Sequence, residues 1–159
     1  MMVCLTRRYR ISAAHRLHNP ALTDEENARL YGKCNNPRGH GHDYALEVTV
    51  CGKVNPATGM VIDLGQLDQV VQREVLDRFD HKHLNLDVED FRTRVPTTEN
   101  LCLAIYHLLE PCFPLSREGD ANLLPENSGA AARLERVRVE ETRSNFFEYQ
   151  GEEGLRSKG

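Results

Sequence analysis

The chain lacks several features that would assign it to a common functional class. Its 159 residues contain no run approaching the roughly 20 apolar residues of a membrane-spanning helix, and residues 1–8 lack a long apolar signal-peptide core. The net charge is -4 and the pI is near 6.0, so no basic stripe is available to neutralise nucleic-acid phosphates. We therefore expect a cytoplasmic protein that binds neither nucleic acid nor membrane.

Paired cysteine motifs are also absent. The five cysteines include no CxxC pair, which argues against a thiolate zinc site, and their odd number argues against a disulfide framework. We expect all five to be reduced, and four of them to be small structural side chains. Cys34 differs because it follows a lysine in a loop, where positive charge would favour the thiolate. It is either a base or nucleophile, or a fifth structural cysteine.

The hydrophobic pattern predicts an α+β fold in a single domain spanning residues 1–159. Period-two alternation predicts strands at 3–14, 43–54, 134–141 and 146–149. Helical spacing follows Asp63, an expected N-cap with Gln66 as its partner. It recurs after Pro96, where Thr97 or Thr98 would cap a second helix.

The expected order is therefore strand, strand, helix, helix, strand, strand. Four antiparallel strands with both helices on one face would leave the other sheet face partly uncovered, and closing several copies into a barrel would cover it and remove exposed edges. Residues 17–41 are expected to be a long functional connection, and residues 116–132 a mobile insertion without a chemical role.

Three histidines indicate a catalytic metal site. His40 and His42 are two residues apart at the head of a predicted strand, so their side chains share a face, and His15 closes the other long alternating run. Three imidazoles suit zinc and leave a fourth position open, as in catalytic sites. The HxH pair alone is weak, since isolated histidines are more often structural, and no HExxH motif supports a zinc hydrolase.

Three further residues have a pattern that suggests chemistry. Asp80 precedes His81 at a helix end, where the carboxylate could orient the ring for proton transfer or simply cap the helix. Glu141 ends a strand after the apolar residues Val137 and Val139. It either emerges into solvent or accepts hydrogen bonds from a guanidine-like edge, as in pterins or guanine.

Six segments form a set that together spans nearly the whole chain: residues 12–17, 31–44, 55–60, 80–86, 97–100 and 139–142. This set resembles the 6-pyruvoyl tetrahydropterin synthase family and, more distantly, the bacterial carboxy-tetrahydropterin synthases. The resemblance implies a T-fold (tunnelling fold) whose protomers form trimeric barrels, stacked as a homohexamer with active sites between subunits. It implies conversion of 7,8-dihydroneopterin triphosphate to 6-pyruvoyl-tetrahydropterin and triphosphate, with Zn2+ in the site and Mg2+ accompanying the triphosphate.

The resemblance also implies roles for particular residues. The implied zinc ligands are His15, His40 and His42; the implied catalytic residues are Cys34 as base with Asp80 and His81 as a proton relay; the implied pterin-binding residues are Glu141, Thr97, Thr98 and Glu99. Asp43 departs from the family, which commonly has Asn after the paired histidines. It is either a partner of the metal ligands or a tolerated change.

Two other functions stay open on sequence grounds. A sister enzyme would keep zinc and pterin but make the carboxy-tetrahydropterin of deazaguanine biosynthesis. A non-catalytic T-fold module would bind a pterin or purine, with the metal and Cys34 incidental. Product analysis distinguishes the sister enzyme from the pyruvoyl enzyme, and replacement of Cys34 tests the non-catalytic module.

Overall fold

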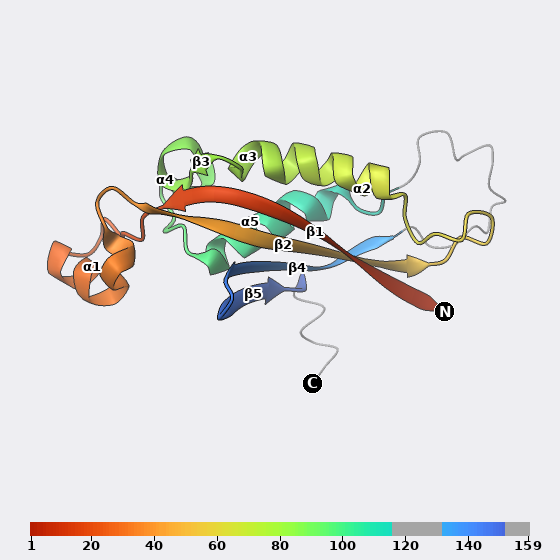
Figure 1. Cartoon of the computed structure of the whole chain (residues 1–159), viewed down its shortest axis with the longest axis horizontal. Helices are drawn as coiled ribbons and strands as arrows, with labels where there is room; N and C mark the ends of the chain where they lie inside the picture. Colours follow the sequence, from red (N-terminus) through yellow and green to blue (C-terminus); the bar gives the residue numbers. More distant parts are fainter. Residues whose placement is uncertain (116–131, 152–159) are drawn as a thin grey trace.

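A single five-stranded sheet organises the protein, whose computed structural model describes residues 1–115 and 132–151 (Figure 1). The strand order is β3-β1-β2-β4-β5. The strands are β1 (Met2–His15), β2 (His40–Lys53), β3 (Lys82–His83), β4 (Arg133–Thr142) and β5 (Asn145–Tyr149). The four predicted strands are confirmed, and their neighbours pair antiparallel.

The expectation of four antiparallel strands is wrong in one respect. The short β3 pairs with β1 in parallel at Ala13 and Ala14, so the sheet is mixed and has a fifth strand. A strand of two residues is too short to show a periodic pattern in the sequence. It forms because the chain returns to the end of β1 after the first covering helix. The sheet is not closed within one chain.

Two helical segments cover one face of the sheet, as predicted (Figure 1). The first comprises α2 (Leu64–Val71), a π-helical turn η2 (Gln72–Leu76) and α3 (Asp77–Phe79); the second is α5 (Thr98–Leu109), with 3-10 turns at Glu89–Phe91 and Glu110–Cys112 and the short α4 (Leu84–Asp87) beside them. The Asp63 side chain accepts from Gly65 N at 2.8 Å, and the Thr97 hydroxyl accepts from Asn100 N at 3.3 Å. Both expected N-caps are therefore confirmed.

The expected irregular connection at 17–41 instead contains a helix. α1 (Asp24–Tyr31) begins with a capping box, in which Glu26 N donates to Thr23 Oγ1 and Thr23 N donates to Glu26 Oε2. A 3-10 turn η1 (Gly32–Asn35) follows. The pattern Thr-x-x-Glu was present in the sequence, but no apolar periodicity accompanied it, because α1 buries only Asn27.

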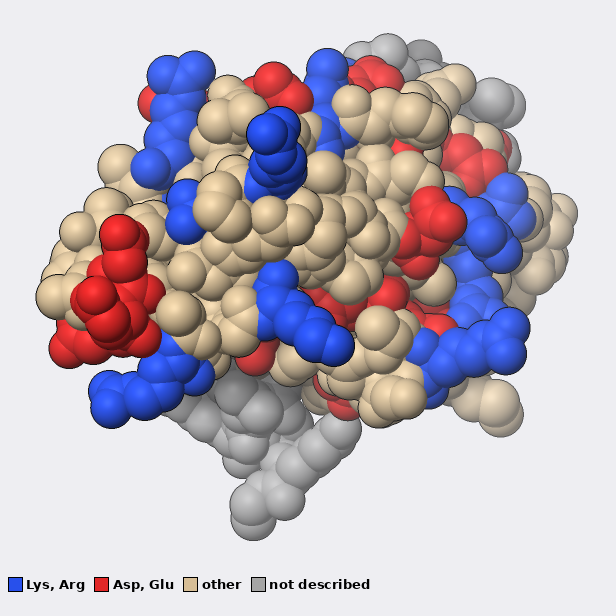
Figure 2. All heavy atoms as spheres, turned by 60° about the vertical axis from the view of Figure 1, so that its left-hand side comes forward, with Lys and Arg blue, Asp and Glu red and all other residues tan. Residues whose placement is uncertain are grey.

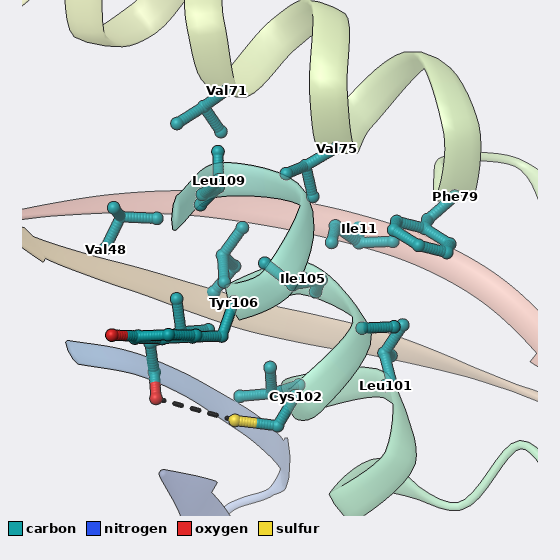
Figure 3. Close-up of a cluster of buried hydrophobic side chains, with 14 of the residues drawn as sticks. Ile11, Val48, Val71, Val75, Phe79, Leu101, Cys102, Ile105, Tyr106 and Leu109 are labelled. Carbon is teal, nitrogen blue, oxygen red and sulfur yellow. Dashed lines mark hydrogen bonds between the residues drawn. The ribbon is translucent and has the colours of Figure 1, made fainter. Parts of the chain in front are cut away.

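The core lies between the helices and the inner face of the sheet (Figure 3). Ile11 and Val48 point from β1 and β2 toward the helices, and Leu101 and Ile105 of α5 are fully buried against them. Burying each such side chain contributes roughly 1.5–3 kcal/mol. The same alternation that fills this core sets which β1 and β2 side chains face inward.

The outer face of the sheet carries ion pairs instead of helices. Glu47 on β2 lies between two arginines, with its carboxylate 3.0 Å from Arg8 Nε and 3.7 Å from Arg138 Nη1. Basic and acidic side chains are interspersed over the face shown in Figure 2, so that face carries no stripe of one sign. Among residues 1–115 and 132–151, no helix covers this sheet face, as expected, while closure of copies into a barrel stays a prediction.

The expectation that all cysteines are reduced is wrong for one pair. Cys4 and Cys51 are direct partners in the β1–β2 register and form a disulfide, with Cα atoms 4.1 Å apart. Cys34, Cys102 and Cys112 are free. Burial raises the pKa of Cys102 to about 12, as expected for a structural thiol.

The insertion predicted at 116–132 lies outside the described residues except for Ala132, which forms an antiparallel bridge with Leu115. In the described ranges, every helix is too short or too polar to cross a bilayer.

Candidate metal centre

Three histidines meet where β1 ends and β2 begins. His15 is the register partner of His40, and His42 lies opposite Ala13, so both long strands deliver imidazoles to the helix-covered face. One nitrogen from each ring lies within 4.8 Å of the others. The structure therefore brings together the trio singled out from sequence spacing, and this group could hold a metal ion.

A backbone carbonyl fixes the orientation of His15. Its Nδ1 is 2.7 Å from Pro96 O, and because a carbonyl only accepts, Nδ1 carries the proton. Nε2 is then unprotonated and lies 3.0 Å from His40 Nε2. Burial, opposed by the Pro96 hydrogen bond, lowers the pKa of His15 to about 4, so the ring is neutral near pH 7. A neutral ring with its second nitrogen bonded to a carbonyl is how proteins prepare a histidine ligand.

Two ring nitrogens in the cluster lack a hydrogen-bond partner among the described residues. They are His42 Nε2 and His40 Nδ1, both buried. Buried polar atoms are seldom left unpaired, and coordination of a cation would satisfy His42 Nε2. His40 instead turns Nε2 toward His15, so its Nδ1 is not counted as a ligand atom. The donor set therefore fits zinc better than calcium or magnesium, which prefer oxygen.

Glu141, at the end of β4, closes one side of the cluster. Its Oε1 lies 3.7 Å from His42 Nε2 and 4.0 Å from His15 Nε2. Thr98 Oγ1 donates to Oε1 at 2.7 Å, and Asn145 Nδ2 donates to Oε2 at 3.0 Å. Burial alone would raise the pKa of Glu141, but these hydrogen bonds and the histidines bring it below its ordinary value, so the group is a carboxylate.

Of the three neighbouring residues assigned to pterin binding, the structure joins only Thr98 to Glu141. Thr97 uses its hydroxyl as the N-cap of α5, and Glu99 is exposed in the first turn of the helix. Thr97 therefore caps the helix, and the adjacent Thr98 contacts the Glu141 carboxylate.

Cys34 lies in η1, which is tied to the end of β1. Leu17 N donates to Cys34 O at 2.9 Å, and Arg16 Nε donates to Asn35 O at 3.1 Å. The Cys34 thiol is half-buried. Burial and Glu141 raise the pKa of Tyr44, and the Cys34 thiol adds to this rise.

Asp80 and His81 form a dyad beside β1, called here the Asp80–His81 dyad. Asp80 Oδ2 is 2.9 Å from His81 Nδ1, and the His81 ring is exposed, with a backbone φ of 57°. Asp80 Oδ1 accepts from Ser12 N at 2.8 Å. Burial would raise the pKa of Asp80, but this bond and His81 bring it below its ordinary value. His81 lines a hollow together with Ser12, His42 and Asp43.

Sequence reasoning missed four residues that support these groups: Ser12, Asn85, Pro96 and Asn145. Asn85 clamps the chain just after His15, since its Oδ1 accepts from Arg16 N and its Nδ2 donates to Arg16 O. These contacts join segments far apart in the chain, and for Pro96 the group is a backbone carbonyl. Local patterns contained no signal for them.

Fold and site together define a class of protein. It is a T-fold-like layer of sheet and helices, with three histidines that could hold a metal ion at one end of its two long strands. Comparison with known proteins gives the family. The family model described as 6-pyruvoyl tetrahydropterin synthase matches residues 4–152, and the chain belongs to that family.

Individual relatives agree with this assignment. A human 6-pyruvoyl tetrahydrobiopterin synthase is 40% identical over 148 residues, which cover 93% of this chain and 91% of that protein. The solved structure of Caenorhabditis elegans 6-pyruvoyl tetrahydropterin synthase has a TM-score of 0.80 and 39% identity, and the match covers 95% of this chain and 96% of that one. A putative 6-carboxy-5,6,7,8-tetrahydropterin synthase of Archaeoglobus fulgidus is 43% identical over only 67 residues, 42% of this chain and 52% of that protein.

Proposed function

We propose that the chain is a 6-pyruvoyl tetrahydropterin synthase, a lyase that converts 7,8-dihydroneopterin triphosphate to 6-pyruvoyl-tetrahydropterin and inorganic triphosphate. The observation that carries the proposal is a three-histidine cluster facing Glu141, with His15 buried and His40 and His42 partly buried, in a chain that matches synthases of this name over most of its length. This activity places the protein in tetrahydrobiopterin biosynthesis.

We propose that His15, His40 and His42 hold zinc, with the unpartnered His42 Nε2 and the carbonyl-oriented His15 as support. Zinc supplies Lewis acidity toward oxygens of the substrate side chain, which eases loss of a neighbouring carbon-bound proton. Mg2+ is proposed only as a companion of the triphosphate, whose oxygens it prefers.

Proton transfer is assigned to Cys34 and the Asp80–His81 dyad. Cys34, held beside the end of β1, would accept a proton from a side-chain carbon at its sulfur. The His81 ring, with Nδ1 on Asp80, leaves Nε2 to deliver or accept a proton as triphosphate departs and the resulting enol becomes a ketone. Asp80 stabilises the charged ring during transfer.

Glu141 is assigned recognition of the pterin ring. A carboxylate offers two oxygens to the two N–H donors along one pterin edge, and Thr98 and Asn145 hold that carboxylate in place. Thr97 and Glu99, at the start of α5, complete the proposed binding segment. A Glu141→Gln variant is expected to raise KM while keeping its zinc; loss of zinc would instead make Glu141 a metal ligand.

A homohexamer built as a dimer of trimers, with active sites between subunits, is proposed for the assembly. Support comes from the edge of the sheet: among the described residues, β3 covers β1 only at Ala13 and Ala14, leaving a long strand edge for pairing with another copy. The proposal also has the Asp80–His81 dyad act across a subunit boundary. Light scattering of the purified protein tests the assembly.

The deciding experiment is incubation with dihydroneopterin triphosphate while inorganic triphosphate is measured, with and without a zinc chelator. Release that the chelator abolishes and zinc restores is expected. Cys34→Ala should lose turnover at full zinc content, whereas Cys112→Ala, which removes another half-buried free thiol, should not. Unchanged turnover by zinc-loaded Cys34→Ala would remove its role as base, and absence of release by the wild type would reject the lyase.

The sister reaction is the second candidate, favoured by the segmental match to the Archaeoglobus protein. Mass spectrometry of the product distinguishes a pyruvoyl from a carboxyl side chain. Binding of a pterin without any turnover would indicate a non-catalytic module.

A further inference from the structure

Ser12 links the Asp80–His81 dyad to β2, the strand that carries His40 and His42. Its backbone N–H donates to Asp80 Oδ1 at 2.8 Å, and its carbonyl accepts from His81 N at 2.6 Å. Its hydroxyl donates to Asp43 Oδ1 on β2. Asp43 directly follows the metal-ligand candidate His42, and all of these residues except Asp80 line one hollow.

The strand pairing explains why the hydroxyl matters. Ser12 and Asp43 are register partners in the antiparallel β1–β2 pair. Because both backbone groups of Ser12 bond to Asp80 and His81, they point away from β2, and this rung is a non-hydrogen-bonded pair. The hydroxyl–carboxylate bond is therefore the direct polar link between the strands at this rung.

The backbone of His81 makes the dyad dependent on this anchor. His81 has a φ of 57°, a left-handed conformation that a residue with a side chain adopts only when its surroundings hold it there. Its N–H bond to the Ser12 carbonyl is one contact that does so, and the Asp80 bond to Ser12 N is a second on the preceding residue.

We propose that Ser12 and Asp43 are positioning residues, which hold the Asp80–His81 dyad at a fixed place relative to the strand that carries His40 and His42. The inference rests on the proposed function and adds a role for Asp43, the residue that follows His42. Asp43 acts through the accepting oxygen of its side chain, so Asn should serve in its place, and both residues act through the dyad.

Kinetics with matched variants test the proposal. Ser12→Ala and Asp43→Ala should each lower kcat about tenfold or more, with KM and zinc content near wild type, because small displacements of a proton-transfer group are costly. The double variant should be no worse than either single variant, since both remove one bond. Ser12→Thr and Asp43→Asn, which keep a donor and an acceptor, should restore most of kcat.

Thr6→Ala is the matched control. Thr6 and Thr49 form another side-chain hydrogen bond, 2.8 Å long, between register partners of the same two strands, but away from the dyad. Its loss should leave kcat unchanged. Equal effects of Thr6→Ala and Ser12→Ala would reduce the role of Ser12 to general strand pairing and overturn the proposal, as would an unchanged kcat in Ser12→Ala.

A spectroscopic readout keeps this inference separate from the proposed function. The ring resonance of His81, assigned by its loss in His81→Ala, should shift or broaden in Ser12→Ala and stay in place in Thr6→Ala. If the wild type releases no triphosphate, the lyase assignment fails while this readout still decides the positioning role. An unmoved His81 resonance in Ser12→Ala overturns it.

Discussion

Breaking the Cys4–Cys51 disulfide is expected to lower stability without lowering activity. The bond closes a loop with a sequence separation of 47 residues. In the chain-entropy account, this constraint on the unfolded state contributes up to about 4 kcal/mol at 25 °C. With a denaturation slope of about 2 kcal/mol per molar urea, reduction should move the urea midpoint down by as much as about 2 M.

The position of the bond explains why activity should survive. Cys4 and Cys51 form one rung of the β1–β2 ladder, and His15 and His40 form another, eleven residues further along β1. At about 3.3 Å per residue the two rungs are about 36 Å apart. Between them lies the part of the sheet that packs on the helices, so loss of the distal bond leaves the metal-centre end held by the core.

The assay compares urea unfolding of air-oxidised protein, dithiothreitol-treated protein and Cys4→Ser, a substitution at an exposed position. Thiol titration of the unfolded, never-reduced chain should find three free cysteines of five. Cys112→Ser is the control, since Cys112 is free, and it should keep the wild-type response to reductant. Five titratable thiols would refute the pairing; three thiols with identical midpoints before and after reduction would refute the loop-entropy reasoning.

Two further predictions concern the metal centre and the sheet–helix contact. Gly39→Ala should lower both the stability and the zinc content of the protein. The added Cβ atom would lie only 2.9 Å from His15 O and 2.8 Å from His83 Nε2. The backbone φ of 72° at this position would also cost an alanine about 1 kcal/mol in strain. Full zinc content per chain would contradict this. Asp68→Asn should weaken the dependence of the unfolding free energy on pH in the acid range, because the Arg7 hydrogen bond lowers the pKa of Asp68. That stabilisation is present above the unfolded pKa and is lost as pH falls through the folded pKa. The difference in unfolding free energy between the two proteins should therefore shrink as the pH falls below about 5, and parallel profiles would rule the linkage out.

Much of the fold followed from the sequence because its signals are local. Period-two alternation located the four main strands, and side-chain caps at Asp63 and Thr97 located the beginnings of both covering helices. The sequence analysis missed α1, although Thr23 and Glu26 form the capping-box pattern that marks a helix start. A helix that buries few side chains lacks the apolar stripe that the periodicity search detects. β3 and the Cys4–Cys51 bond depend on which segments meet, and neither has a local signature.

The candidate site likewise contains residues that local sequence patterns predicted and contacts that they did not. The histidine trio could be predicted because His40 and His42 share a strand face and His15 ends the neighbouring run. Glu141 was singled out as a carboxylate at a strand end, but its bond to Asn145 was not foreseen, since it depends on the turn between β4 and β5. The resemblance to a family, rather than spacing, supplied the chemical roles, which the experiments above must test.

The register of two strands determines on which face the chemistry is placed. Along β1, Ile11 and His15 face the helices, whereas Ser12 faces β2's Asp43 on the outer side of the sheet. A slip of one residue between β1 and β2 would move every side chain to the opposite face, taking Ile11 out of the core together with His15 out of the metal centre. Burial of the core therefore fixes the face of the sheet on which the histidines lie. The same alternation places the side chains of Ser12 and Asp43 on the outer face, while Asp80 and His81 bond to the Ser12 backbone at the β3 edge of the sheet. That edge, which β3 covers only at Ala13 and Ala14 among the described residues, is where the proposed assembly would bring a neighbouring copy to each site.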